Sequence, residues 1–365
     1  MTVRRFAAAS LLAATALVAA TPASAQRVTR IVAFGDSYAD TGNLFRIGGI
    51  NPISTVVYTT GRFSGGTNYI DTLSTLLNAP QVNFAIGGAT TGFANVTTSA
   101  PLGFQTEVAS FLAGGGTLFP ATTPKFGPND LLALSVGGND ANGYQGAGGT
   151  VAGAAAAANV SVANFTSGVN ALVGAGARNI SYIALQPETA PRVAGDPAAQ
   201  QVLRAFSSTF NAGIQAPLAG YAANGAIVNY LDVGLVGARI TATPAAYGIT
   251  NLVCPAFPNP TCVVNASGYL FYGDQLHLTS DGFRIVAKYV AAQMEAPLTL
   301  QATSDLALDT ARQFGRTMTA RMDAGSPRDG ELLSGVRLFA MGDTFSRTAD
   351  ATFTSDQIKI GRAHV

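Results

Sequence analysis

Apolar residues in this chain gather in five short continuous runs, each followed by turn-forming residues. The runs cover 28–34, 81–85, 130–136, 179–185 and 226–233. Runs of this length without strict alternation are typical of central strands in a parallel sheet, because such strands are buried on both faces. The pattern therefore predicts about five parallel strands.

Stretches with helical character separate these runs, at 68–77, 105–112, 153–174, 198–224 and 279–294. The last begins at Thr279, a good N-cap residue, and continues with apolar residues at helical spacing. Strands that alternate with helices predict an α/β fold in which helices flank the sheet. We expect one such domain over residues 26–296.

The N-terminal residues have the pattern of a signal peptide. Arg4 and Arg5 precede an apolar, Ala-rich stretch at 6–20, and Ala23-Ser24-Ala25 follows it. A membrane helix is the alternative, but the apolar part is short and is followed by Thr-Pro. We expect residues 1–25 to be cleaved and the protein to be secreted, to the periplasm, the cell surface or the medium.

Export bears on the two cysteines, Cys254 and Cys262, which lie close together in "CPAFPNPTC". In an oxidising compartment we expect them to form a disulfide, worth roughly 2 to 3 kcal/mol; a pair of free thiols is the alternative. A metal site would need further ligands that the segment lacks, so no metal is expected.

The balance of charge excludes one class of partner. Apolar residues make up 48% of the chain and charged residues 11%, with a net charge of +1. A nucleic-acid-binding surface requires a basic stripe that contacts several phosphates, and the sequence has no run of Lys or Arg. We expect no nucleic-acid partner.

Candidate chemistry begins with histidine, because the chain has only His277 and His364. In "YGDQLHLTSDG", Asp274 precedes His277 by three residues and could orient the imidazole toward a nucleophile. Asp281 is the alternative partner, but its place at a helix start favours capping. Ser37 follows the first strand in "FGDSYADTGN" and is the candidate nucleophile; its neighbour Asp36 suits a structural turn acid.

Two further turns follow neighbouring strands. "NFAIGGATTG" contains Gly87-Gly88, and "LALSVGGND" contains Gly137-Gly138-Asn139. Carboxyl ends of parallel strands open at one edge of a sheet, so these turns could supply donors to an oxyanion near Ser37. The glycines could instead form simple turns, and Asn139 could cap the next segment while Asp140 does the polar work.

Together, these ordered blocks resemble the GDSL, or SGNH, hydrolase family over most of residues 29–293. The resemblance implies a three-layer flavodoxin-like fold and no cofactor. It also implies that Ser37 is the nucleophile, that Asp274 and His277 complete the triad, and that the Ser37 amide, Gly88 and Asn139 form the oxyanion hole.

Two positions depart from the family pattern. Tyr38 stands where the family usually has Leu, and Leu278 stands where it usually has Pro. The first would change a wall of the acyl pocket, and the second removes a rigid turn beside His277.

The segments "DTGN" and "GRFSGG" are similar to the branch of the family that includes autotransporter esterases and secreted lipases. In that branch a helix and a membrane β-barrel follow the esterase. Residues 297–365 predict one helix and then strand-like alternation, so we expect the truncated start of such a region. Outer-membrane association is expected if the full gene encodes the barrel.

The sequence therefore predicts a secreted serine esterase that hydrolyses carboxylic esters of small or lipid substrates. A lysophospholipase or lipase, or a polysaccharide deacetylase, would use the same triad. A surface passenger without enzymatic activity is the alternative from a different class.

Overall fold

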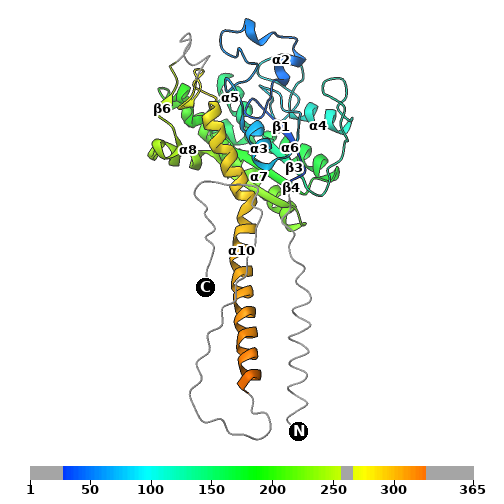
Figure 1. Cartoon of the computed structure of the whole chain (residues 1–365). Coiled ribbons are helices and arrows are strands. Elements are labelled where there is room, and N and C mark those ends of the chain that lie inside the picture. Colours follow the sequence, from blue (N-terminus) through cyan, green and yellow to red (C-terminus); the bar gives the residue numbers. More distant parts are fainter. Residues whose placement is uncertain (1–27, 256–265, 326–365) are drawn as a thin grey trace.

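A five-stranded parallel sheet lies between layers of helices (Figure 1), and its strand order is β2-β1-β3-β4-β5. The computed structural model describes residues 28–255 and 266–325. The strands are β1 (Arg30–Gly35), β2 (Gln81–Asn83), β3 (Asp130–Ser135), β4 (Asn179–Ala184) and β5 (Ile227–Asp232). All five predicted strands are confirmed, and each end lies within two residues of its expected place.

Both faces of the sheet are buried, as the continuous apolar runs require. In β1, Ile31 and Ala33 belong to one hydrophobic cluster, and Val32 and Phe34 belong to the other. This follows from the two-residue period of a strand, which sends successive side chains to opposite faces. β1 also pairs in parallel with both β2 and β3, so it lies between these two strands.

Helices cover each face. One face packs against α4 (Phe104–Leu112), α6 (Val151–Gly174) and α7 (Pro197–Ala223). The other packs against α3 (Tyr69–Leu77), α8 (Val233–Ala242) and the first turns of α10 (Ser280–Gly325). The predicted three-layer α/β fold is confirmed. Short elements complete it: α2 (Asn43–Ile47), α5 (Gly138–Gly146), and the 3₁₀ turns Pro52–Ser54, Pro187–Thr189, Pro191–Val193 and Pro244–Tyr247.

The last helix corrects the sequence prediction. Thr279 is its cap as expected, since its hydroxyl accepts a hydrogen bond from the Gly282 N–H at 3.2 Å. The helix expected within residues 297–365 is also present, but it is not separate, because α10 runs continuously from Ser280 through Pro297 to Gly325 instead of ending at Met294. Strong helix formers such as Ala, Leu and Gln flank that proline, and their propensity offsets the lost backbone bond.

The far part of α10 extends away from the α/β layers (Figure 1), and Leu308 and Phe314 on it are exposed. None of the described helices is both long and apolar enough to span a membrane. The predicted signal peptide and the strand-like region after residue 325 lie outside the described residues, as does His364.

A second, two-stranded parallel sheet precedes the candidate histidine. It consists of β6 (Asn251–Val253) and β7 (Tyr269–Phe271). Cys254 follows β6 and is fully buried. Its expected partner Cys262 lies outside the described residues, so the disulfide stays a prediction.

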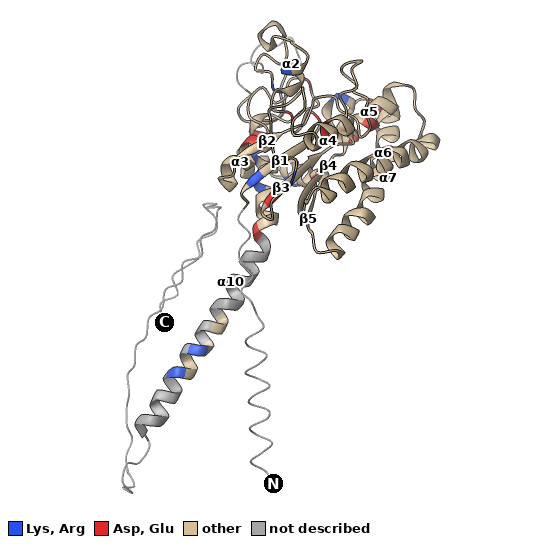
Figure 2. Ribbon diagram, turned by 90° about the vertical axis from the view of Figure 1, so that its right-hand side faces the viewer, with Lys and Arg blue, Asp and Glu red and all other residues tan. Residues whose placement is uncertain are grey.

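Charged residues are few and of both signs over the α/β layers (Figure 2).

Candidate active site

Three turns meet at the carboxyl ends of neighbouring strands. Ser37 follows β1, Gly87-Gly88 follows β2, and Gly137-Gly138-Asn139 follows β3. Because β1 lies between β2 and β3, the turn with Ser37 is flanked by the other two. The sheet therefore places the predicted nucleophile beside both predicted donor turns.

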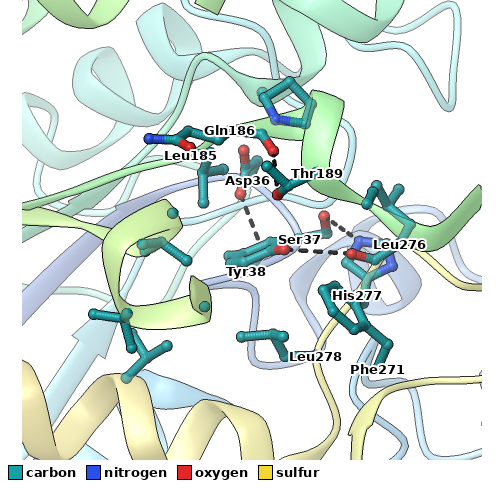
Figure 3. Close-up of a pocket in the computed structure, with 18 of the residues that line it drawn as sticks. Asp36, Ser37, Tyr38, Leu185, Gln186, Thr189, Phe271, Leu276, His277 and Leu278 are labelled. Carbon is teal, nitrogen blue, oxygen red and sulfur yellow. Dashed lines mark hydrogen bonds between the residues drawn. The ribbon is translucent and has the colours of Figure 1, made fainter. Parts of the chain in front are cut away.

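Ser37 and His277 are 240 residues apart in sequence, and their side chains are in direct contact. The Ser37 Oγ and the His277 Nε2 are 2.6 Å apart. Figure 3 shows the two side chains pointing toward each other at one end of a cavity. Both residues are buried, with 8% and 5% of their surface exposed. This is the spacing that a nucleophile and its general base require.

Asp274 orients the imidazole from the other side. Its Oδ2 lies 2.5 Å from the His277 Nδ1, and its Oδ1 accepts the backbone N–H groups of Leu276 and His277, each at 2.9 Å. Burial would raise the pKa of Asp274, but the neighbouring His277 and the hydrogen bonds outweigh it and lower that pKa to about 2. Asp274 is therefore an ionised acceptor for the imidazole N–H.

Asp281 serves neither the triad nor the helix cap. Its Oδ2 accepts the Gly268 backbone N–H at 2.8 Å, because the Thr279 hydroxyl already occupies the cap position. The expected capping role was wrong.

Two backbone amides beside the nucleophile are available as donors. Within the described part of the chain, the Ser37 and Gly88 N–H groups have no acceptor. The amides on either side of Gly88 are bound: the Gly87 N–H by Asp40 at 2.7 Å and the Ala89 N–H by Ile86 at 3.0 Å. Gly88 has a φ of +82°, and a Cβ there would collide with Thr97, so only glycine fits.

Asn139 connects the third turn to the second. Its Nδ2 donates to the Ala89 carbonyl at 3.1 Å, which leaves the second amide proton for a ligand. Asp140 has a different role, because it accepts from the Thr91 N–H at 2.9 Å and the Ser161 hydroxyl at 2.7 Å. The alternative that Asp140 does the polar work at the site is therefore not favoured.

Buried carboxyl groups hold the turns together, and sequence reasoning missed most of them. Glu107 on α4 accepts the backbone N–H groups of Gly35 at 2.7 Å and Ile86 at 3.0 Å, and so joins the ends of β1 and β2. Burial raises the pKa of Glu107 well above its usual range. A signal existed: Glu107 lies three residues after Phe104 and four before Phe111, on the apolar face of the helix.

Asp40 and Asp36 complete this group. Asp40 accepts the backbone N–H groups of Gly42 and Gly87, each at 2.7 Å, and burial raises its pKa. The Oδ1 of Asp36 accepts the Tyr38 N–H and the Ser135 hydroxyl, each at 3.1 Å. Burial raises the pKa of Asp36 to about 7. Asp36 therefore holds the turn around Ser37, in keeping with its expected structural role.

Tyr58 is a further site residue that no sequence pattern indicates. Its hydroxyl donates to Asp274 Oδ2 at 2.6 Å, from 216 residues away. No local motif marks such a contact.

A cavity of about 80 Å³ opens beside Ser37, Asn139 and His277. Aliphatic side chains that line this cavity include Leu185, Val233, Val236, Ile240, Leu278 and Val286. Both departures from the family pattern line it. Tyr38 donates from its hydroxyl to the Leu276 carbonyl at 3.3 Å, beside the catalytic candidates (Figure 3), and Leu278 is buried.

Among the described residues, no group of three or more His, Cys, Asp or Glu side chains could hold a metal ion.

A protein-family model described as GDSL-like Lipase/Acylhydrolase matches residues 31–290. The chain belongs to this family. The match includes every residue assigned above to the candidate site, so the family assignment and the site geometry concern the same segment.

Similar proteins include the thermolabile hemolysin of Vibrio parahaemolyticus, which is 25% identical over 232 residues. That match covers 63% of this chain and 51% of the hemolysin, so the chain spans about half the length of that relative. A solved extracellular lipase from Streptomyces rimosus is 17% identical, with a TM-score of 0.39, and the match covers 72% of this chain and 100% of the lipase. Phospholipase A1 from Streptomyces albidoflavus NA297 is also 17% identical, with a TM-score of 0.38 and coverage of 72% and 99%.

Proposed function

We propose that this hydrolase is a serine esterase that cleaves carboxylic esters through an acyl-serine intermediate. The observation that carries the proposal is the 2.6 Å contact between Ser37 Oγ and His277 Nε2, with Asp274 behind the imidazole. An unactivated serine hydroxyl is a weak nucleophile, and a hydrogen-bonded imidazole is the group that activates it.

The reaction follows from these contacts. His277 takes the Ser37 proton as the Oγ attacks the ester carbonyl, and Asp274 stabilises the imidazolium that forms. The Ser37 and Gly88 N–H groups and the Asn139 amide donate to the oxyanion. His277 then gives its proton to the leaving alcohol. Water repeats the cycle on the acyl-serine and releases the acid.

The cavity supports a short acyl group. A cavity of about 150 Å³ binds benzene, so the 80 Å³ beside Ser37 suits an acyl chain of only a few carbons. A short p-nitrophenyl ester such as the acetate is therefore the suitable assay substrate. A profile over acyl chain length would separate this esterase from a lipase or lysophospholipase on the same triad, and acetylated polysaccharides would test for a deacetylase. The predicted signal peptide supports action outside the cytoplasm.

The decisive variant is Ser37→Ala. We expect turnover of p-nitrophenyl acetate to fall by about a million-fold, because the nucleophile is lost. The wild type should also react covalently with a serine-directed fluorophosphonate, and the variant should not. Circular dichroism of both proteins checks that the fold survives. Turnover that persists in Ser37→Ala would refute the proposal, and a wild type that neither turns over esters nor takes the label would favour a non-enzymatic passenger.

A further inference from the structure

Asp274 receives a hydrogen bond from a loop distant in sequence. The Tyr58 hydroxyl donates to Oδ2 at 2.6 Å, the same oxygen that lies 2.5 Å from His277 Nδ1. The Oδ1 atom is occupied by the backbone N–H groups of Leu276 and His277. Among the described residues, Tyr58 is thus the donor that reaches this carboxylate from outside its own loop.

The tyrosine ring is firmly packed, so the hydroxyl has a fixed position. Its centroid lies 4.7 Å from that of Phe63, 6.2 Å from that of Tyr272 and 6.1 Å from that of the His277 imidazole. The Tyr272 hydroxyl also donates to the Val57 carbonyl at 2.8 Å, and this tethers the backbone next to Tyr58. Burial, together with the negative Asp274, raises the pKa of Tyr58, which therefore remains a proton donor.

We propose that Tyr58 is a positioning residue of the catalytic apparatus, which acts on His277 through the Asp274 carboxylate. The inference rests on the esterase function proposed above. By donating to Oδ2, Tyr58 fixes the direction in which that oxygen faces the imidazole. It also shares the negative charge of the carboxylate, and so limits how strongly the imidazolium is stabilised.

Other titratable or charged groups lie around Tyr58, Asp274 and His277, and they also influence how the activity depends on pH. Asp36 and Tyr38 lie on the turn after β1, Tyr272 lies on the loop before Asp274, and Arg192 lies on the neighbouring 3₁₀ turn. All of them are retained in Tyr58→Phe. A change in that variant therefore reports the missing hydroxyl.

The experiment compares the full-length wild type with Tyr58→Phe, which keeps the packed ring. We expect kcat on p-nitrophenyl acetate to fall roughly 10- to 100-fold with little change in KM, because Asp274 Oδ2 is no longer held in its direction toward His277, and this loss of orientation outweighs the stronger stabilisation of the imidazolium. We also expect the acidic limb of the kcat/KM profile to move to higher pH, because the unshared carboxylate charge favours the imidazolium.

Tyr221→Phe is the matched control. It removes a tyrosine hydroxyl whose hydrogen bond, to Asn170 Oδ1 at 2.8 Å, does not involve the site, so we expect less than about threefold loss and an unmoved acidic limb. Thermal unfolding of both variants checks that each is folded at the assay temperature.

Three outcomes would overturn the inference. The first is Tyr58→Phe activity within twofold of wild type with the same pH profile. The second is an equal loss in both variants with no shift of the limb, which would show a structural role only. In either case the wild type is active and the esterase function stands. The third is a wild type that neither hydrolyses esters nor takes a fluorophosphonate, which refutes the proposed function and this inference together.

Discussion

The two halves of the site are held in place by opposite electrostatic means. The nucleophile half, which comprises the turns after β1, β2 and β3, depends on buried carboxyl groups that bind backbone N–H groups, and burial raises their pKa values. The acid–base half, residues 272–279, has one carboxylate whose pKa is lowered to about 2 beside its histidine. The ionised form is thus disfavoured for the buried carboxyl groups of the first half and favoured for Asp274 beside His277 in the second.

This difference predicts a separation of stability from activity. The buried carboxyl groups of the nucleophile half connect the turns at the strand ends, so substituting them should mainly lower the free energy of unfolding. Asp274 faces the imidazole from a loop, so changing it should mainly lower the rate. The following variants test that separation.

The largest effect is expected for Asp274→Asn. The new amide would oppose the His277 Nδ1–H, so the imidazole would adopt the tautomer that cannot take the Ser37 proton, and kcat should fall about 10⁴-fold. Asparagine keeps the size of the side chain and the acceptor for the two backbone N–H groups. Steady-state kinetics and thermal unfolding measure both quantities. A rate within tenfold of wild type would contradict the assignment of Asp274.

The pH dependence of the stability of Asp274→Asn gives a second test. A lowered pKa means that Asp274 contributes stability above about pH 4, and that this contribution is lost as pH falls toward 2. The variant should lack that acid-side loss.

The next effect concerns Glu107 in the nucleophile half. Glu107→Ala leaves the Gly35 amide buried without an acceptor, while the Ile86 amide keeps the Gly35 carbonyl at 2.9 Å, so we expect the free energy of unfolding to fall by about 1 to 3 kcal/mol. Glu107→Gln keeps one acceptor and should lose about half as much. Urea titration followed by circular dichroism measures both.

Ala109→Gln, on the exposed side of the same helix, is the matched control and should stay within about 0.5 kcal/mol of wild type. The separation between the two halves would be wrong if Glu107→Gln unfolded like wild type yet lost activity as severely as Asp274→Asn.

The parts of the fold that could be predicted are those with a local signal. The central strands were predictable because burial on both faces requires continuous apolar runs, and the turns with Ser37, Gly88 and Asn139 follow those runs directly. α8 was not predicted, since Gly234 and Gly237 weaken its helical signal, and the three-residue strands β6 and β7 are too short to show a pattern. The continuity of α10 was not predicted, because the change in composition after Pro297 suggested two separate helices.

The contacts of the candidate site also differ in whether a local sequence signal predicts them. Asp274 and His277 are three residues apart, so their pairing could be predicted from spacing alone. The contact of Tyr58 with Asp274 depends on the tertiary structure, because the loop and the carboxylate are 216 residues apart. Glu107 is intermediate: a carboxylate on the apolar face of a helix is a visible anomaly, but the sequence does not reveal which amides it binds.

The smallest effect, and the sharpest test of the electrostatic contrast, is the pH dependence due to Asp36. Its pKa is raised from 3.8 to about 7, so the folded protein holds this proton more tightly than the unfolded chain does. Stability from this group is therefore fully present below about pH 4 and falls as pH rises toward 7, opposite in sign to Asp274. Asp36→Asn mimics the protonated form and should not show this decline. Between pH 5 and pH 6 the wild type should lose about 1 kcal/mol relative to the variant, as measured by urea titration at each pH. Parallel curves for the two proteins would show that Asp36 is ionised at no cost, and the contrast between the halves would then rest on Asp40, Glu107 and Asp140 alone.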